Sequence, residues 1–101
     1  MSGNENELTW LQEWYLNQCN GDWEHQRGVT VDTVDNPGWT LSIDLRGTNL
    51  EGKLFQDLKI ERTAADWVNC KIEKQTFKGA GGPRNLTELI AVFRRWAEDA
   101  A

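Results

Sequence analysis

The sequence lacks any long hydrophobic run. No window of its 101 residues approaches the roughly 18 uninterrupted apolar residues that a membrane-spanning helix needs. Residues 1–7 are polar and acidic, without the basic start and apolar run of a secretory signal, so we expect a cytoplasmic protein. The length predicts one domain over residues 1–101, in which we expect residues 1–7 to be disordered.

Metal ligands and thiols are scarce. The chain has one histidine and two cysteines, Cys19 and Cys70, far apart in the sequence. Zinc needs three or four ligands, and no acidic cluster has the spacing of a calcium loop, so we expect no metal site and no cofactor. Both cysteines lie among apolar neighbours. Free thiols are therefore expected, with a Cys19–Cys70 disulfide as the alternative.

Positive charge is also in short supply. There are 11 Lys and Arg against 16 Asp and Glu, and the net charge is −5. A phosphate backbone repels such a surface, which argues against direct nucleic-acid binding. The same charge attracts a basic protein partner and raises its association rate. The alternative is that the acidity only keeps the protein soluble.

Amphipathic segments begin and end the chain. Thr9 and Gln12 match a capping box, which predicts a helix from Thr9 to a stop at Asn20-Gly21. Asn85 and Glu88 predict the start of a second helix, whose apolar residues share one arc. The sequence therefore predicts a helix at each end of the domain.

Between these helices, apolar and polar side chains alternate as in half-buried strands. The alternating segments are residues 29–32, 39–46, 54–61 and 68–73. Asn36-Pro37-Gly38 predicts a type II turn, with Pro37 first and a positive φ at Gly38. The short connections predict an α+β fold, in which a four-stranded antiparallel meander is flanked by the two helices on one face.

A glycine-rich segment, residues 78–84, precedes the last helix. We interpret it as a flexible turn that returns the helix to the sheet. Backbone amides there could also hold an anion, but the Lys-Ser/Thr pair of a P-loop is missing.

The segment Asp22-Trp23-Glu24-His25 gathers two carboxylates, an indole and the only histidine. It permits three interpretations: recognition of a basic partner, acid–base catalysis by His25, or a loop held on the core by Trp23 with its charges in water. Cys19 is a candidate nucleophile for the enzymatic alternative.

Six tryptophans are unusual in so short a chain. Most are expected in the core, with one or two as exposed anchors for a partner. Trp67 falls out of phase with Val68 and Cys70, which places it on the open face of the sheet, near Asp44 or Glu73. The alternative is that it covers the edge of the core.

Several segments resemble the immunity protein 53 family: 10–15, 19–25, 35–39, 45–48, 66–67, 81–83 and 93–96. The most specific are Asn20-Gly21-Asp22-Trp23-Glu24-His25 and Asp35-Asn36-Pro37-Gly38-Trp39. The resemblance implies a bacterial protein that binds and blocks a cognate toxin domain in the cell that makes it. It carries no established catalytic residues.

Residue pattern and resemblance together lead to one hypothesis: a non-enzymatic immunity protein that occludes the active surface of a toxin. Charge alone favours a basic toxin, such as a nuclease. The alternatives are a small enzyme using Asp22, Glu24 and His25, or an adaptor that forms a homodimer; the oligomeric state is open between monomer and homodimer. The predicted partner-contact residues are Asp22, Trp23, Glu24, His25, Asp35, Trp39, Asp44, Asp66 and Trp67.

Overall fold

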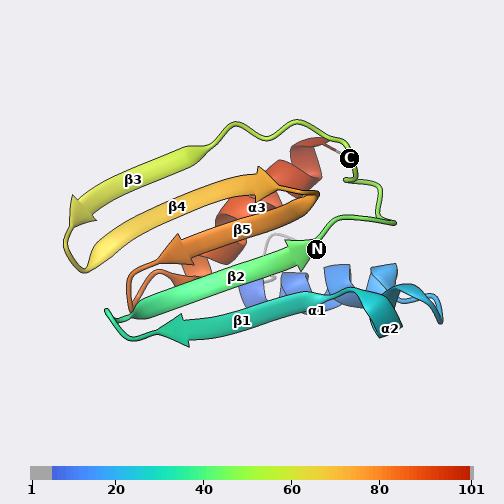
Figure 1. The fold of residues 1–101 in the computed structure, drawn as a ribbon, viewed down its shortest axis with the longest axis horizontal. Coiled ribbons are helices and arrows are strands. Elements are labelled where there is room, and N and C mark those ends of the chain that lie inside the picture. Colours follow the sequence, from blue (N-terminus) through green and yellow to red (C-terminus); the bar gives the residue numbers. More distant parts are fainter. Residues whose placement is uncertain (1–5, 101) are drawn as a thin grey trace.

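A computed structural model describes residues 6–100, which form one sheet and three helices (Figure 1). In chain order the elements are α1 (Glu7–Gln18), α2 (Trp23–Gln26), β1 (Val29–Val34), β2 (Gly38–Asp44), β3 (Leu58–Thr63), β4 (Asp66–Glu73), β5 (Thr76–Gly81) and α3 (Leu86–Ala100). The predicted α+β class, antiparallel sheet and terminal helices are confirmed.

The sheet has five strands, so the prediction of a four-stranded meander is wrong. Its order is β1-β2-β5-β4-β3, and every neighbouring pair is antiparallel. The first four strands therefore form two hairpins at the two sides of the sheet. β5, the last strand in the chain, lies between them and pairs with both β2 and β4. Figure 1 shows β5 running between these two strands.

The missed strand is the first part of the glycine-rich segment. Gly79 and Gly81 lie in β5 on the side that faces α3, and a Cβ atom built on Gly79 would lie 3.2 Å from Leu89 Cδ2. Glycine within a strand often marks such a close approach. The segment is thus a central strand that lets α3 pack tightly, and its interpretation as a flexible turn is wrong for residues 78–81.

Both terminal helices lie on one side of the sheet. α3 packs across β2, β5 and β4, and α1 packs against α3 (Figure 1). Phe93 of α3 contacts the rings of Trp10, Trp14 and Phe77 with centroid distances of 5.1–5.8 Å. The core therefore lies between the sheet and this helix pair, and the other face of the sheet is open.

The first helix begins earlier than expected. Asn6 caps α1 by accepting a 2.7 Å hydrogen bond from the Thr9 N–H, so the capping box at Thr9 is wrong. Asn6 and Glu7 belong to the folded part of the chain, contrary to the expected disorder over residues 1–7. The rest of that expectation, residues 1–5, lies outside the described residues.

Two connections also differ from expectation. The Asn36–Pro37 peptide is cis, and Gly38 has no positive φ, so the type II turn is wrong. Gly38 is required for another reason, because a Cβ there would lie 2.3 Å from the Gly81 carbonyl oxygen. The third predicted strand begins four residues late, at Leu58, because Leu54 lies in the preceding connection and is 94% exposed.

Candidate functional site

The predicted contact residues fall at two opposite ends of the sheet. Asp22, Trp23, Glu24 and His25 lie beside the end of β2, with Asp44. The other group lies where β2 begins and β5 ends: Asp35, Trp39, Asp66 and Trp67. Since each strand rises about 3.3 Å per residue, the two groups are about 20 Å apart. The structure does not bring all these residues into one patch.

Trp23 is the anchor of the first group. Its side chain is buried, and its indole N–H donates a 2.9 Å hydrogen bond to the Arg46 carbonyl. Its ring lies edge-on to Trp14, with the centroids 6.2 Å apart. Trp23 begins the short helix α2 and pins it to the core, as the third sequence interpretation proposed.

Glu24 has a local structural task. Its carboxylate accepts hydrogen bonds of 2.9 and 2.8 Å from the backbone N–H groups of Asn20 and Gly21. Hydrogen bonds from its own backbone N–H and from these two groups hold the pKa of Glu24 below its ordinary value. Glu24 therefore closes the turn between α1 and α2, whereas Asp22 and His25 beside it are exposed.

The geometry provides no support for a Cys19–His25 catalytic pair. The Cys19 thiol donates to the Tyr15 carbonyl at 3.3 Å, and no hydrogen bond joins it to His25 within residues 6–100. Cys70 is free and buried in β4, where burial raises the pKa of its thiol to about 12. Cys19 is also a free thiol.

Asp44 is the centre of a charge cluster at the end of β2. Its carboxylate accepts hydrogen bonds from Arg46 at 3.0 and 3.1 Å and from Arg27 at 3.3 Å. Burial tends to raise the pKa of Asp44, but these hydrogen bonds outweigh it and hold the pKa below its ordinary value. The two arginines thus share the single carboxylate of Asp44.

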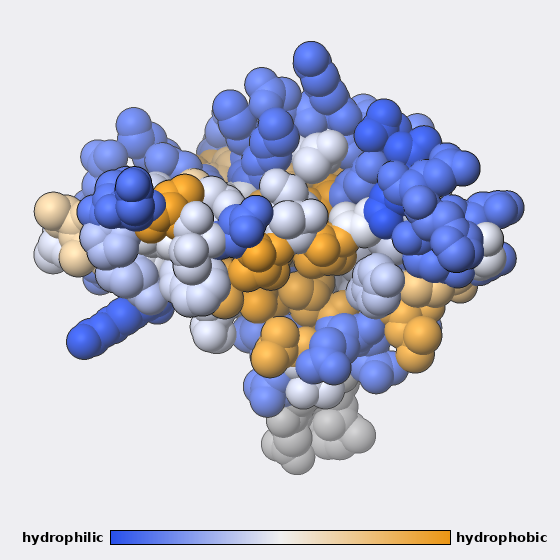
Figure 2. All heavy atoms as spheres, turned by 60° about the horizontal axis from the view of Figure 1, so that its bottom comes forward, coloured by the Kyte–Doolittle hydropathy of each residue, from blue (hydrophilic) through white to orange (hydrophobic). Residues whose placement is uncertain are grey.

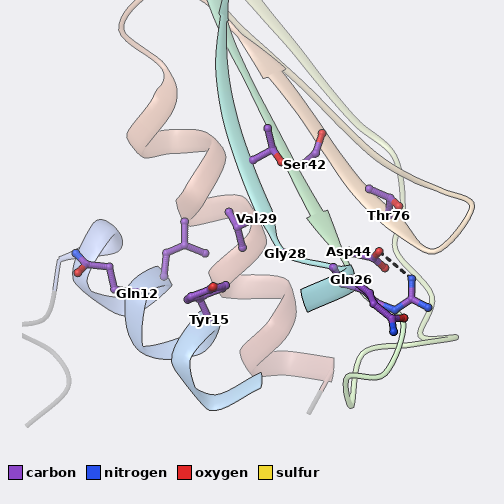
Figure 3. A pocket seen from close by; sticks show the side chains of 11 residues that line it. Gln12, Tyr15, Gln26, Gly28, Val29, Ser42, Asp44 and Thr76 are labelled. Atoms are coloured by element: carbon purple, nitrogen blue, oxygen red, sulfur yellow. Dashed lines mark hydrogen bonds and ion pairs between the residues drawn. The ribbon is translucent and has the colours of Figure 1, made fainter. Parts of the chain in front are cut away.

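A hollow of about 600 Å³ adjoins this cluster and wraps around the start of β1. Figure 3 shows Gln12 and Tyr15 of α1 on one side of β1, and Asp44 with Thr76 on the other. Val29 lies between them. The lining is mixed polar and apolar and does not include His25.

At the other end, Trp39 is half-buried, and its indole N–H donates to the Pro83 carbonyl at 2.9 Å. Asp35 lies in the β1–β2 turn and is exposed. Trp67 is half-buried and out of phase with the buried Val68, as predicted, which places it on the open face. The expected proximity of Trp67 to Asp44 or Glu73 is wrong. Asp44 and Glu73 both pair with Thr76, which begins β5 at the opposite end of the sheet.

Asp66 belongs to a polar network that ties β4 to α3. Arg62 donates to Asp66 at 2.8 Å and also bonds the Glu88 carboxylate. The buried side chain of Asn85 donates to both carboxylates at 3.0 Å and accepts from the Trp67 N–H at 3.3 Å. Asn85 thus precedes α3 as predicted, and its side chain contacts Glu88. The same side chain also bonds Asp66 and the Trp67 N–H, both in β4.

The sequence analysis did not single out β1 itself. This edge strand carries two exposed valines, Val31 at 42% and Val34 at 39%, and one carboxylate, Asp32. Asp22, Asp32 and Asp35 are exposed and make no ion pair with any described residue. We call these three residues the acidic edge. Alternation predicted a strand over residues 29–32, but the position of that strand at the edge of the sheet had no signal in the sequence.

Comparison with known families gives one match: the family described as Immunity protein 53 matches residues 8–98. The chain belongs to the immunity protein 53 family. No curated protein and no solved structure matches it.

Membership of the immunity protein 53 family indicates a toxin-neutralising function that depends on binding a cognate toxin. None of the helices in residues 6–100 is long and apolar enough to cross a membrane. In the same part of the chain, no three His, Cys, Asp or Glu side chains are grouped so as to hold a metal ion.

Proposed function

We propose that this immunity protein 53 family member neutralises its toxin by covering the toxin's active surface, without chemistry of its own, in the cytoplasm of the cell that makes it. The free thiols of Cys19 and Cys70 suit that reducing compartment. The partner is a basic toxin domain, for which a nuclease is the leading type, because such enzymes bind anionic substrates with cationic surfaces.

The acidic edge is the observation that carries this proposal. Asp32 lies in β1, Asp35 follows in the turn to β2, and Asp22 lies at the α2 corner that precedes β1 (Figure 1). None of the three has an ion pair that would neutralise it among the described residues. Arg27, the nearest arginine in sequence to β1, is engaged by Asp44. A cationic surface therefore meets uncompensated negative charge here, which raises its association rate.

The other predicted contact residues remain part of the proposal with different tasks. Trp23 and Glu24 shape the α2 corner that presents Asp22 and His25. The group at the opposite end provides a second contact region, in which Trp67 offers a half-buried indole on the open face. Trp39 and Asp44 bond to neighbouring backbone groups, and Asp66 accepts from the side-chain amide of Asn85.

The first experiment asks whether neutralisation occurs at all. The chain is co-expressed with the toxin domain encoded beside its gene, and growth is compared with that of cells expressing the toxin alone. We expect growth to be restored. If the toxin kills equally in both strains, the proposed function is wrong.

The second experiment tests the acidic edge. We expect the double substitution Asp22→Lys, Asp35→Lys to slow toxin association by about tenfold at low salt, because it reverses the charge that steers the partner. Rates are measured by surface plasmon resonance at several salt concentrations. The matched control is Asp57→Lys, Asp99→Lys, which makes the same change in net charge at two exposed residues outside β1, just before β3 and at the C-terminal end of α3 (Figure 1). Equal slowing by the control would show that only net charge matters.

A further inference from the structure

The two edges of the sheet are built differently. β3 carries charged side chains at Lys59, Glu61 and Arg62, and its register shifts between Glu61 and Thr63. β1 has the sequence Val-Thr-Val-Asp-Thr-Val, pairs with β2 without any shift, and contains one charge and no proline. Lysines, prolines and bulges normally prevent a sheet edge from pairing with another strand. The β3 edge has such protection and the β1 edge does not.

The hydrogen-bond pattern shows which backbone groups β1 leaves unpaired. The Asp44 N–H donates to the Gly28 carbonyl at 3.1 Å, so Gly28 and Asp44 form a hydrogen-bonded pair. Such pairs alternate along an antiparallel ladder. Thr30 and Asp32 therefore bond to β2, and the N–H and C=O groups of Val29, Val31 and Thr33 point away from the sheet.

An apolar surface lies beside these groups. Val29 and Val31 pair with the buried Ile43 and Leu41, so they are on the helix side of the sheet. α1 lies beside them, because its Leu11 and Tyr15 line the same hollow as Val29. Figure 2 shows apolar side chains gathered on this face. An added strand could place alternate apolar side chains there, as in known β-strand addition.

We infer that the β1 edge is the docking site for an extended, basic strand of the toxin, which adds to the sheet as a sixth strand. This deepens the proposed function and rests on it for the identity of the partner. The strand alternates apolar side chains, which face α1, with basic ones, which meet Asp32 across the pair. Charge complementarity argues for this occupant, because Asp32 has no ion pair within the described residues.

A second copy of this chain fits the edge less well. With the two β1 strands antiparallel and centred on Val31, each Asp32 faces Thr30 of the partner and stays uncompensated. The two copies also bring together net charges of −5 each. Self-association is therefore an outcome that the test must separate from strand addition by a basic partner.

The first test uses synthetic peptides and needs no toxin. A seven-residue peptide alternating lysine and valine is added to the protein, and amide hydrogen exchange is followed by NMR. We expect at least tenfold slower exchange at Val29, Val31 and Thr33, and no change with a peptide that has glutamate in place of lysine. No slowing at these amides, or equal slowing by both peptides, would overturn the inference. Slowing that grows with protein concentration alone would assign the edge to a second copy.

The second test uses the toxin domain and variants of the full chain. Val31→Pro removes an outward N–H, and Asp32→Lys places a lysine on the edge, so we expect each to weaken toxin binding at least tenfold. The matched control is Lys59→Pro, whose N–H points outward from the other edge, because Leu58 and Ile60 are the β3 residues that bond to β4. It should change binding less than threefold.

The outcomes of these tests are distinguishable. If the wild-type chain neutralises the toxin and Val31→Pro and Asp32→Lys both bind as tightly as Lys59→Pro, docking at β1 is wrong and the proposed function stands. If the wild-type chain fails to neutralise, the proposed function is wrong, and the peptide experiment decides by itself whether the edge accepts a basic strand.

Discussion

At the scale of single residues, three tryptophans fasten irregular segments to the folded core. Each donates its indole N–H to a backbone carbonyl: Trp23 to Arg46 at 2.9 Å, Trp39 to Pro83 at 2.9 Å and Trp96 to Leu54 at 2.7 Å. Tryptophan suits this task because one side chain buries a large ring and also satisfies a polar group. Half of the six tryptophans therefore fasten connections between elements.

This role predicts a difference between two tryptophan substitutions. We expect Trp23→Phe to lower the free energy of unfolding by about 1–3 kcal/mol, because it loses buried volume and the hydrogen bond to Arg46. Trp67→Phe is the matched control, since the Trp67 indole is half-buried and donates no hydrogen bond to a described residue. It should cost less than about 1 kcal/mol. Urea denaturation followed by circular dichroism measures both, and equal losses would contradict the fastening role.

At the scale of elements, one polar network ties the start of α3 to β3 and β4. Arg62 at the end of β3 bonds Asp66 in β4 and Glu88 in the first turn of α3, and Asn85 bridges the two carboxylates. Hydrogen bonds from Asn85 and Arg62 hold the pKa of Asp66 below its ordinary value, and those from Arg62 and Asn85 do the same for Glu88. The network thus stabilises the folded state with both carboxyl groups ionised.

This network predicts how stability depends on pH. Because both pKa values are lower in the folded state, the contribution is present above the ordinary carboxyl pKa and is lost as pH falls below about 4. We expect Arg62→Gln to be less stable than wild type at pH 7, with a difference that shrinks as pH falls. Urea titrations at a series of pH values measure it.

The control for this series is Lys53→Gln, since Lys53 is exposed and makes no ion pair with any described residue. Its difference from wild type should stay constant with pH. A constant difference for Arg62→Gln as well would show that the network does not carry the pH dependence.

Elements with a strong local pattern were predictable, and those decided by distant contacts were not. The alternation of Leu41, Ile43 and Leu45 correctly identified β2, and all three are fully buried. β5 was missed because its glycines are explained only by the approach of Leu89, which is distant in sequence. The start of α1 was misplaced because Asn6 and Thr9 are both good caps, and only the folded structure shows which one acts.

At the scale of the whole molecule, β5 joins two hairpins that otherwise make no common sheet. β1 pairs with β2, β3 pairs with β4, and β5 supplies the contacts between them. α3 then covers the three central strands. The fold is therefore completed by residues 76–100.

This topology predicts that a chain ending at Gln75 does not fold. Without β5 and α3, β2 and β4 each lose a neighbouring strand, and the core loses Phe77, Leu89 and Phe93. We expect no cooperative urea transition by circular dichroism, and restoration when a peptide of residues 76–100 is added to the truncated chain. A cooperative transition of residues 1–75 alone would contradict this prediction.

The candidate site was predictable only in its chemistry. Composition predicts an acidic surface, and the segment around Asp22 lies at one end of the proposed edge. Its neighbours in space could not be predicted, because the strand order places Asp66 and Trp67 near the Asp35 turn and far from Asp22. The backbone groups of β1 are unpaired on one side because β1 lies at an edge of the sheet, and alternation in the sequence does not reveal that position.

The late position of β5 in the chain sets the order in which the sheet can form during synthesis. A ribosome makes the two hairpins before the strand that unites them, so a partly synthesised chain presents the β1 edge without a stable sheet behind it. Translation must pass residue 81 before that sheet is complete. If the proposed neutralisation needs this sheet, a cell is protected only after β5 has been synthesised.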